Sequence, residues 1–226
     1  MKLKLKLNKT IYYTMMLLLL FIVSQIFILN GVAQQIQISS NTPPQAVEYL
    51  QRAVNKMEEA LNTYQEGAHY PGRKLWAEAI DYAQKALEID PDFVEAHYYL
   101  ALMFQYTGWY YREAEQWEKY LDLIEGTDLT STSLQAQQNL AHAYYRLGFN
   151  SYQKGDYEQS LTYFLNSIKE YPDLIDSNYW AARVFYETGD YNQAIRYYQE
   201  VLNLQPDNAE ANYWLKESQR RLGAKQ

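Results

Sequence analysis

The fold is decided by the stretch GDYEQSLTYFLNSIKEYPD, residues 155–173, which returns as GDYNQAIRYYQEVLNLQPD at residues 189–207. Glycine, aspartate and tyrosine open both copies, and proline and aspartate close them. Each residue of the first copy is separated from its counterpart in the second by the same number of positions as Gly155 and Gly189. Upstream, Leu147-Gly148 falls on Ala181-Ala182 at the same offset. Self-similarity at one fixed period predicts a series of stacked supersecondary units.

The units are predicted to be helical. Apolar residues from Val47 to Tyr64 recur every three or four positions, which is the period of an amphipathic helix, and no segment shows the sustained alternation of a strand. Gly155 and Gly189 fall where a left-handed residue would end one helix before the next begins. The pattern therefore indicates pairs of helices joined by short turns.

At these residues the chain resembles the tetratricopeptide-repeat family, whose unit carries W-x2-L-G-x2-Y, then A-x3-F, then a closing proline. Tyr144-x2-Leu147-Gly148, Ser160-x3-Phe164 and Pro172 match one unit, and the equivalent positions one period later match the next. The resemblance covers about Pro44 to Leu222. It implies an all-α fold, a right-handed solenoid of antiparallel helix hairpins with a capping helix from Ala209 to Leu222.

Two places depart from the regular period. The interval from Pro91 to Pro172 is longer than two regular units, and we expect the additional residues in a loop from Gly126 to Thr130 and an early helix start near Ser133. The first hairpin has a long connection, Gly67 to Arg73. We expect a leader or anchor at residues 1–33, a linker at 34–43, the repeat domain at 44–222 and a tail at 223–226.

The N-terminus has the composition of a targeting segment. Four lysines and no acid precede an uncharged run from Ile11 to Leu29, which is long for a cleaved signal peptide and only just long enough to span a bilayer. Gly31-Val32-Ala33 favours cleavage before Gln34, while an uncleaved anchor remains the alternative. Both interpretations place the rest of the chain outside the cytoplasm, at the cell surface, in a periplasm or in the medium.

Composition argues against several classes of site. After Ala33 the chain has 16 basic and 27 acidic residues, a net charge of −11, so it would repel nucleic acid. No cysteine is present, and the histidines, His69, His97 and His142, stand far apart, so we expect no metal and no other cofactor. Carboxylate pairs such as Glu113 with Glu115 are interpreted as parts of solvated helices. The sequence has no phosphate-binding loop or nucleophile motif, and we expect no enzyme.

Tyrosine is unusually abundant, with 24 residues, many of them on the first helices of the predicted hairpins. Aromatic side chains with polar tips make adaptable contact surfaces. Eight residues occupy the same stripe, beside the small packing residues, on successive first helices and on the capping helix. They are predicted to line a concave partner-binding groove: Tyr98, Tyr145, Phe149, Tyr152, Tyr179, Arg183, Tyr186 and Tyr213. The alternative is that these tyrosines only fill gaps between successive helices.

The sequence thus predicts an extracytoplasmic, non-catalytic scaffold that binds a protein or peptide in an aromatic-lined groove. A membrane would be a second contact only through an uncleaved N-terminal segment. The alternative function is a structural subunit that self-associates or holds a cell-envelope complex together. Neither the identity of the partner nor the choice between a peptide and a folded surface follows from these residues.

Overall fold

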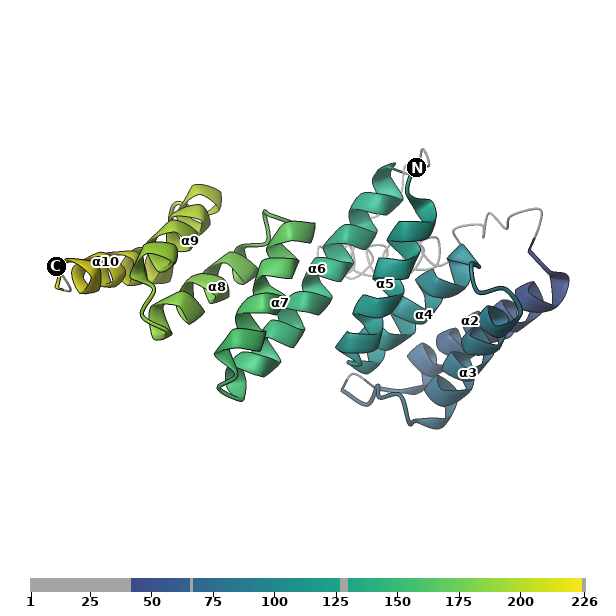
Figure 1. Cartoon of the computed structure of the whole chain (residues 1–226). Coiled ribbons are helices and arrows are strands. Elements are labelled where there is room, and N and C mark those ends of the chain that lie inside the picture. The colour runs from purple at the N-terminus through teal and green to yellow at the C-terminus, as the bar shows by residue number, and fades with distance from the viewer. Residues whose placement is uncertain (1–41, 66, 127–129, 225–226) are drawn as a thin grey trace, which may run out of the picture. The chain divides into compact units, whose positions relative to one another are not determined.

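The computed structural model describes residues 42–65, 67–126 and 130–224, and in these residues it contains nine helices and no strand (Figure 1). The predicted leader, and the linker up to residue 41, lie outside the described residues. The helices are α2 (Pro44–Thr63), α3 (Lys74–Ile89), α4 (Val94–Thr107), α5 (Tyr110–Ile124), α6 (Thr130–Gln153), α7 (Tyr157–Glu170), α8 (Ile175–Glu187), α9 (Tyr191–Leu204) and α10 (Ala209–Gly223).

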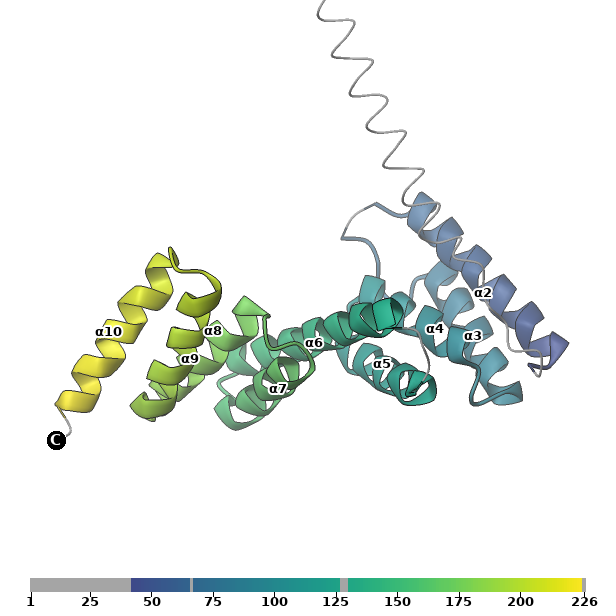
Figure 2. The same cartoon turned by 90° about the horizontal axis from the view of Figure 1, so that it is seen from above.

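The helices pack as four consecutive hairpins and one final helix. The most extensive contacts join α2 with α3, α4 with α5, α6 with α7, and α8 with α9, and each hairpin also contacts the next along the chain (Figures 1 and 2). Helix α10 packs on α9. The predicted all-α solenoid of helix hairpins is therefore confirmed.

The repeated glycine and aspartate form the turn between the two helices of a hairpin. Gly155 and Gly189 adopt φ values of 78° and 82°, the left-handed region in which glycine is favoured, and they end α6 and α8 as predicted. The aspartate that follows caps the next helix. Asp156 accepts a hydrogen bond from the Gln159 backbone N–H at 3.1 Å, and Asp190 accepts one from Gln193 at 3.2 Å.

Small residues set the distance between paired helices. A Cβ added to Gly148 would lie 2.7 Å from two ring carbons of Phe164, so only glycine allows this approach between α6 and α7. The Ser160 hydroxyl, from α7, donates to the Gly148 carbonyl at 2.9 Å. In the next hairpin Ala182 and Ala194 are both fully buried. The predicted close contacts are confirmed.

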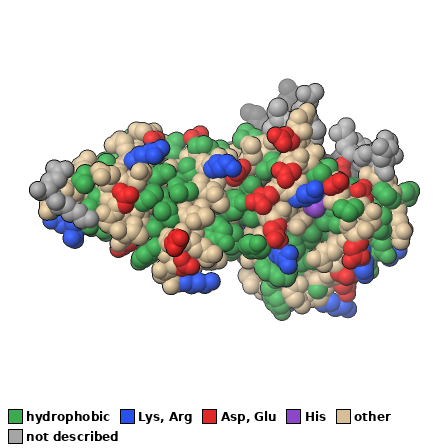
Figure 3. All heavy atoms as spheres, in the orientation of Figure 1, with side chains coloured by type: hydrophobic (Ala, Val, Ile, Leu, Met, Phe, Trp, Pro, Cys, Tyr) green, Lys and Arg blue, Asp and Glu red, His purple; other side chains and the backbone are tan. Residues whose placement is uncertain are grey.

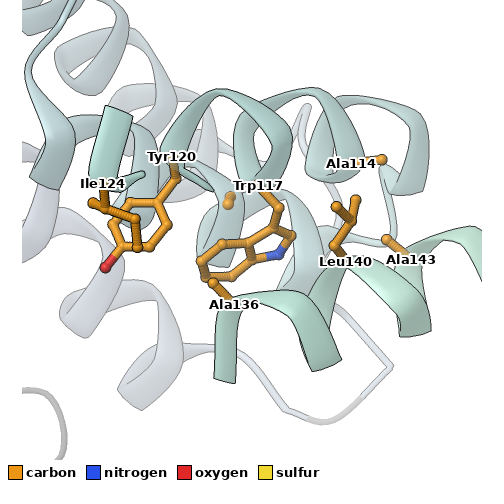
Figure 4. Close-up of a cluster of buried hydrophobic side chains, with 8 residues drawn as sticks. Ala114, Trp117, Tyr120, Ile124, Ala136, Leu140 and Ala143 are labelled. Atoms are coloured by element: carbon orange, nitrogen blue, oxygen red, sulfur yellow. The ribbon is translucent and has the colours of Figure 1, made fainter. Parts of the chain in front are cut away.

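Helix α6 takes up much of the irregular spacing in the third unit. It has 24 residues, against 13 in its counterpart α8, and it begins at Thr130, slightly before the expected start near Ser133. Of the expected loop, residues 127–129 lie outside the described residues. The first part of α6 packs along α5. Figure 4 shows Trp117 and Tyr120 of α5 facing Ala136 and Leu140 of α6.

The long connection in the first hairpin, Tyr64–Arg73, is held by polar and aromatic contacts. Trp76 Nε1 donates to His69 Nδ1 at 3.0 Å, and the Tyr64 hydroxyl accepts from the Leu75 backbone N–H at 3.2 Å. The Arg73 guanidinium lies 3.9 Å from the centre of the Tyr64 ring.

Candidate functional site

The predicted groove residues lie on the first helices of three hairpins and on the final helix. Tyr98 is on α4, three aromatic residues are on α6, and Tyr179, Arg183 and Tyr186 are on α8. All of these are half-buried, whereas Tyr213 on α10 is 62% exposed. On the face seen in Figure 3, apolar and tyrosine side chains reach the surface with charged groups between them.

At the junction of α6 and α8, the aromatic rings gather around Trp180. The ring centres of Phe149 and Tyr152 both lie 4.9 Å from that of Trp180, and Tyr179 lies at 5.7 Å, all in edge-to-face arrangements. Tyr145 continues the contacts by stacking on Phe149 at 6.3 Å. Edge-to-face pairs at these distances are favourable for aromatic rings. Four predicted residues are thus brought together by a tryptophan that the prediction omitted.

A similar arrangement stands at the junction of α8 and α10. Trp214 contacts Tyr186 at 5.0 Å and Tyr213 at 5.1 Å between ring centres. The Arg183 guanidinium lies 3.7 Å from the centre of the Trp214 ring, a close cation–π contact, and its Nη2 pairs with Glu187 at 2.5 Å. Arg183 is therefore held within this second group of rings.

We call these residues of α6, α8 and α10 the aromatic row. It comprises seven of the eight predicted residues and two tryptophans: Tyr145, Phe149, Tyr152, Tyr179, Trp180, Arg183, Tyr186, Tyr213 and Trp214. Its half-buried members also pack against the buried cores of the last two hairpins. These rings therefore fill space between helices and keep part of their surface exposed.

Tyr98 lies apart from the aromatic row. Its ring contacts Tyr99, Trp117 and Tyr120 at 5.4 to 5.5 Å between ring centres, inside the second hairpin. Burial, and then the nearby Tyr106, raise the pKa of Tyr98. The structure thus places this predicted groove residue beside the core shared by α4, α5 and α6.

The sequence did contain a signal for the two missed tryptophans. Tyr179-Trp180 and Tyr213-Trp214 are the same dipeptide, repeated at the offset that separates Gly155 from Gly189. The two tryptophans occupy equivalent junctions, each closing on the preceding first helix, so the repetition of the pair predicts the repetition of the contact.

A second group of exposed aromatic side chains lies outside the aromatic row, near the turns within the first two hairpins. Tyr70 is 53% exposed, Tyr106 and Trp109 are each 47% exposed, and Tyr111 is 56% exposed. These residues provide matched exposed aromatics for control variants.

Two of the histidines, His97 and His69, make hydrogen bonds inside the helix array. His97 is buried, with Nδ1 at 2.8 Å from Gln116 Oε1 and Nε2 at 2.9 Å from the Pro91 carbonyl. His69 accepts the hydrogen bond from Trp76, and His142 is half-buried, with its pKa lowered by burial. In the part of the chain that the structure describes, no three His, Asp or Glu side chains converge as metal ligands would.

The expectation that Glu113 lies on a solvated helix face is wrong, because this residue is fully buried. Arg146 of α6 approaches the carboxylate of this α5 residue to 3.6 Å, and neither Glu113 oxygen has a hydrogen-bond partner within the described residues. Burial raises the pKa of Glu113 to about 7, although Arg146 opposes the shift. This pair joins α5 of the second hairpin to α6 of the third.

The chain matches two models of known repeats, and both matches fall on hairpins described above. Residues 141–174 match the model described as Tetratricopeptide repeat, and residues 182–223 match the one described as TPR repeat. The first covers the end of α6 and all of α7, and the second runs from α8 to α10. No curated protein matches the chain.

Among solved structures, a crystal structure of MamA protein is 18% identical, with a TM-score of 0.47, covering 79% of this chain and 83% of that one. YrrB, titled a TPR protein with an unusual peptide-binding site, is 16% identical, with a TM-score of 0.34 and coverage of 76% and 92%. The fixed sequence period, the helix hairpins and the two repeat matches together establish the family: the chain is a tetratricopeptide-repeat protein.

Proposed function

We propose that this protein is a non-catalytic scaffold that binds a protein or peptide segment along the aromatic row. The observation that carries the proposal is the continuity of half-buried and exposed rings across α6, α8 and α10. Tyrosine, tryptophan and arginine are the side chains that most often supply binding energy at protein interfaces. A row held rigid by its own packing loses little side-chain freedom when a partner binds.

The absence of a recognisable catalytic motif in the sequence supports a binding role rather than chemistry. The aromatic row itself offers rings, hydroxyl groups and one guanidinium. Arg183 is already engaged by Trp214 and Glu187. Such groups suit recognition.

The location proposed for this scaffold is outside the cytoplasm. The support is the lysine-rich start followed by the apolar run Ile11–Leu29, both of which lie outside the described residues. Within residues 42–65, 67–126 and 130–224, no helix combines the length and apolar character needed to cross a membrane. Two measurements on the native product decide between the alternatives. A mass that begins at Gln34 would show cleavage, whereas a product that begins at Met1 and resists carbonate extraction would show an anchor.

The test of the proposed function uses the full chain and a library of displayed random peptides. We expect enriched peptides to bind the parent protein, and Tyr213→Ala to weaken binding by roughly tenfold or more, as expected for loss of an aromatic anchor. Tyr213 is 62% exposed, so its truncation should leave the thermal unfolding midpoint nearly unchanged. Tyr111→Ala is the matched control, because Tyr111 is 56% exposed and lies outside the aromatic row.

Two results would contradict the proposed function. Enriched peptides that bind Tyr213→Ala as well as the parent but lose affinity for Tyr111→Ala would move the site to the first two hairpins. A reversible increase in mass with concentration, measured by sedimentation equilibrium and abolished by Tyr213→Ala, would show that the row joins copies of this chain. That outcome would favour the alternative role as a self-associating structural subunit.

A further inference from the structure

The first helices that carry the aromatic row also carry a second repeated feature, an acidic residue three positions before a tyrosine. Asp176 precedes Tyr179 on α8, and Glu210 precedes Tyr213 on α10. Residues three apart lie on the same side of a helix, so each carboxylate is presented beside its tyrosine. On α6 the equivalent position before Tyr145 holds His142.

Each carboxylate also acts electrostatically on a tyrosine of the preceding first helix. After burial, the charge of Asp176 is the next cause that raises the pKa of Tyr145 on α6, and Glu210 has the same influence on Tyr179 of α8. The two acids therefore lie at the junctions where the rings gather.

Asp176 and Glu210 have no lysine or arginine partner, unlike the two glutamates that lie beside Arg183 and Tyr186. Glu187 pairs with Arg183, and Glu217 pairs with Arg220 at 2.6 Å and with Arg221 at 3.0 Å. Asp176 and Glu210 are exposed, and neither forms an ion pair with a lysine or arginine of the described residues. Each junction of the aromatic row thus has beside it an exposed carboxylate that no lysine or arginine of the described residues pairs with.

These acids have an ordinary role as well, because both lie in the first turn of a helix. A negative charge there interacts favourably with the helix dipole, a weak effect that falls off within the first turn. That role is independent of a partner. Glu158 occupies the first turn of α7, is exposed and lies outside the aromatic row, so it can report the dipole effect alone.

We propose that the aromatic row binds a cationic segment, in which lysine or arginine side chains lie against the ring faces and pair with Asp176 and Glu210. The proposal rests on the proposed function and adds the chemistry of the partner. Aromatic faces attract cations, and the net charge of −11 after Ala33 favours the approach of a positive chain. Asp176 and Glu210 lie one repeat apart on the first helices α8 and α10, so a segment that crosses both junctions can pair with both carboxylates.

The experiment measures binding of three synthetic peptides to the full chain by calorimetry. Each peptide has about twelve residues, with lysine, glutamine or glutamate at every third position and serine and alanine between them. We expect the lysine peptide to bind at least tenfold more tightly than the glutamate peptide, and added salt to weaken it. Combining Asp176→Asn with Glu210→Gln should reduce the preference for the lysine peptide roughly tenfold, while Glu158→Gln should leave it unchanged.

The inference is overturned if the lysine and glutamate peptides bind equally, or if the preference survives in the double variant. The proposed function is tested separately by the peptides that display selects. If those peptides depend on Tyr213 but are neutral or acidic, the aromatic row binds peptides and the cationic partner is wrong. If no peptide of any charge depends on Tyr213, the proposed function itself fails.

Discussion

At the scale of single residues, Gly148 marks a close approach between α6 and α7. We predict that Gly148→Ala lowers the free energy of unfolding, because the new methyl group would lie 2.7 Å from the fully buried Phe164 ring. Alanine improves helix propensity by about 1 kcal/mol, but overpacking costs about 1–3 kcal/mol. Chemical denaturation should therefore show a net loss.

Gly223→Ala is the control for that prediction. Gly223 ends α10, and nothing lies within 4 Å of the position where its Cβ would be built. This variant should unfold at the same denaturant concentration as the parent or at a slightly higher one. Equal stability of Gly148→Ala and the parent would mean that α6 and α7 separate easily.

A second residue-scale prediction concerns the pH dependence produced by Glu113. Its folded pKa of about 7 lies above the ordinary value of 4.5, so the folded state binds the proton more tightly than the unfolded state does. The contribution of this group to the free energy of unfolding is fully present below about pH 4.5 and is lost as the pH rises through 7. Its size is on the order of 3 kcal/mol.

Glu113→Gln should remove this dependence, because an amide does not titrate. The difference in unfolding free energy between variant and parent, measured from pH 5 to about pH 8, separates the contribution of Glu113 from that of other titrating groups. We expect the variant to gain on the parent as the pH rises. A constant difference across this range would show that Glu113 keeps an ordinary pKa.

At the scale of helices, the sequence predicted what depends on local chemistry. Glycine at 155 and 189 and aspartate at 156 and 190 determine turns and caps by their own conformations and hydrogen bonds, so the hairpin boundaries could be read directly. The length of α6 was harder to predict. Residues 130–139 are rich in serine, threonine and glutamine, and Ala136 and Leu140 become core residues only because α5 lies alongside.

In the candidate site too, local spacing could be predicted but contacts between helices could not. Helical spacing placed seven of the predicted residues in one row, but it could not show that Tyr98 faces Trp117 in the second hairpin. Burial of His97 and Glu113 likewise depends on partners from other helices, Gln116 and Arg146, which no local pattern identifies. Contacts between elements were therefore the part that sequence reasoning could not supply.

An element-scale prediction follows from the pairing of α8 with α9. Ala194 is fully buried in the cluster that includes Ala182 and Tyr198. We predict that Ala194→Leu lowers the free energy of unfolding by about 1–3 kcal/mol, because the added carbon atoms strain a packed site. Ala209→Leu, at the exposed first residue of α10, is the control and should change stability by less than about 0.5 kcal/mol. Similar denaturation midpoints for the two variants would contradict the assigned repeat register.

At the scale of the whole array, each hairpin packs mainly on its neighbours, so stability is expected to be a sum of hairpin terms and interface terms. The aromatic row occupies the last two hairpins and α10. The first two hairpins carry the other exposed aromatics and the buried Glu113. The proposed binding surface and the buried Glu113 thus lie in different hairpins, and a change at one end of the array should act chiefly on the properties of that end.

The final helix tests this division. Helix α10 covers the last hairpin through buried Ala211 and Leu215, and it supplies Trp214, which holds Arg183 and Tyr186. We predict that a chain ending at Pro206 unfolds at a lower temperature, with a loss of roughly 2 kcal/mol or more from the uncovered apolar surface. The newly exposed face of α9 should make this chain self-associate at high concentration.

A chain ending after Leu222 is the control for this truncation, since it keeps the contacts of α10. Thermal unfolding and sedimentation equilibrium on both chains distinguish two roles for the helix. If the shorter chain stays monomeric and keeps the melting temperature of the parent, α10 serves binding alone. Early melting with self-association shows instead that α10 closes the solenoid as well, because only a helix that covers apolar surface exposes it when removed.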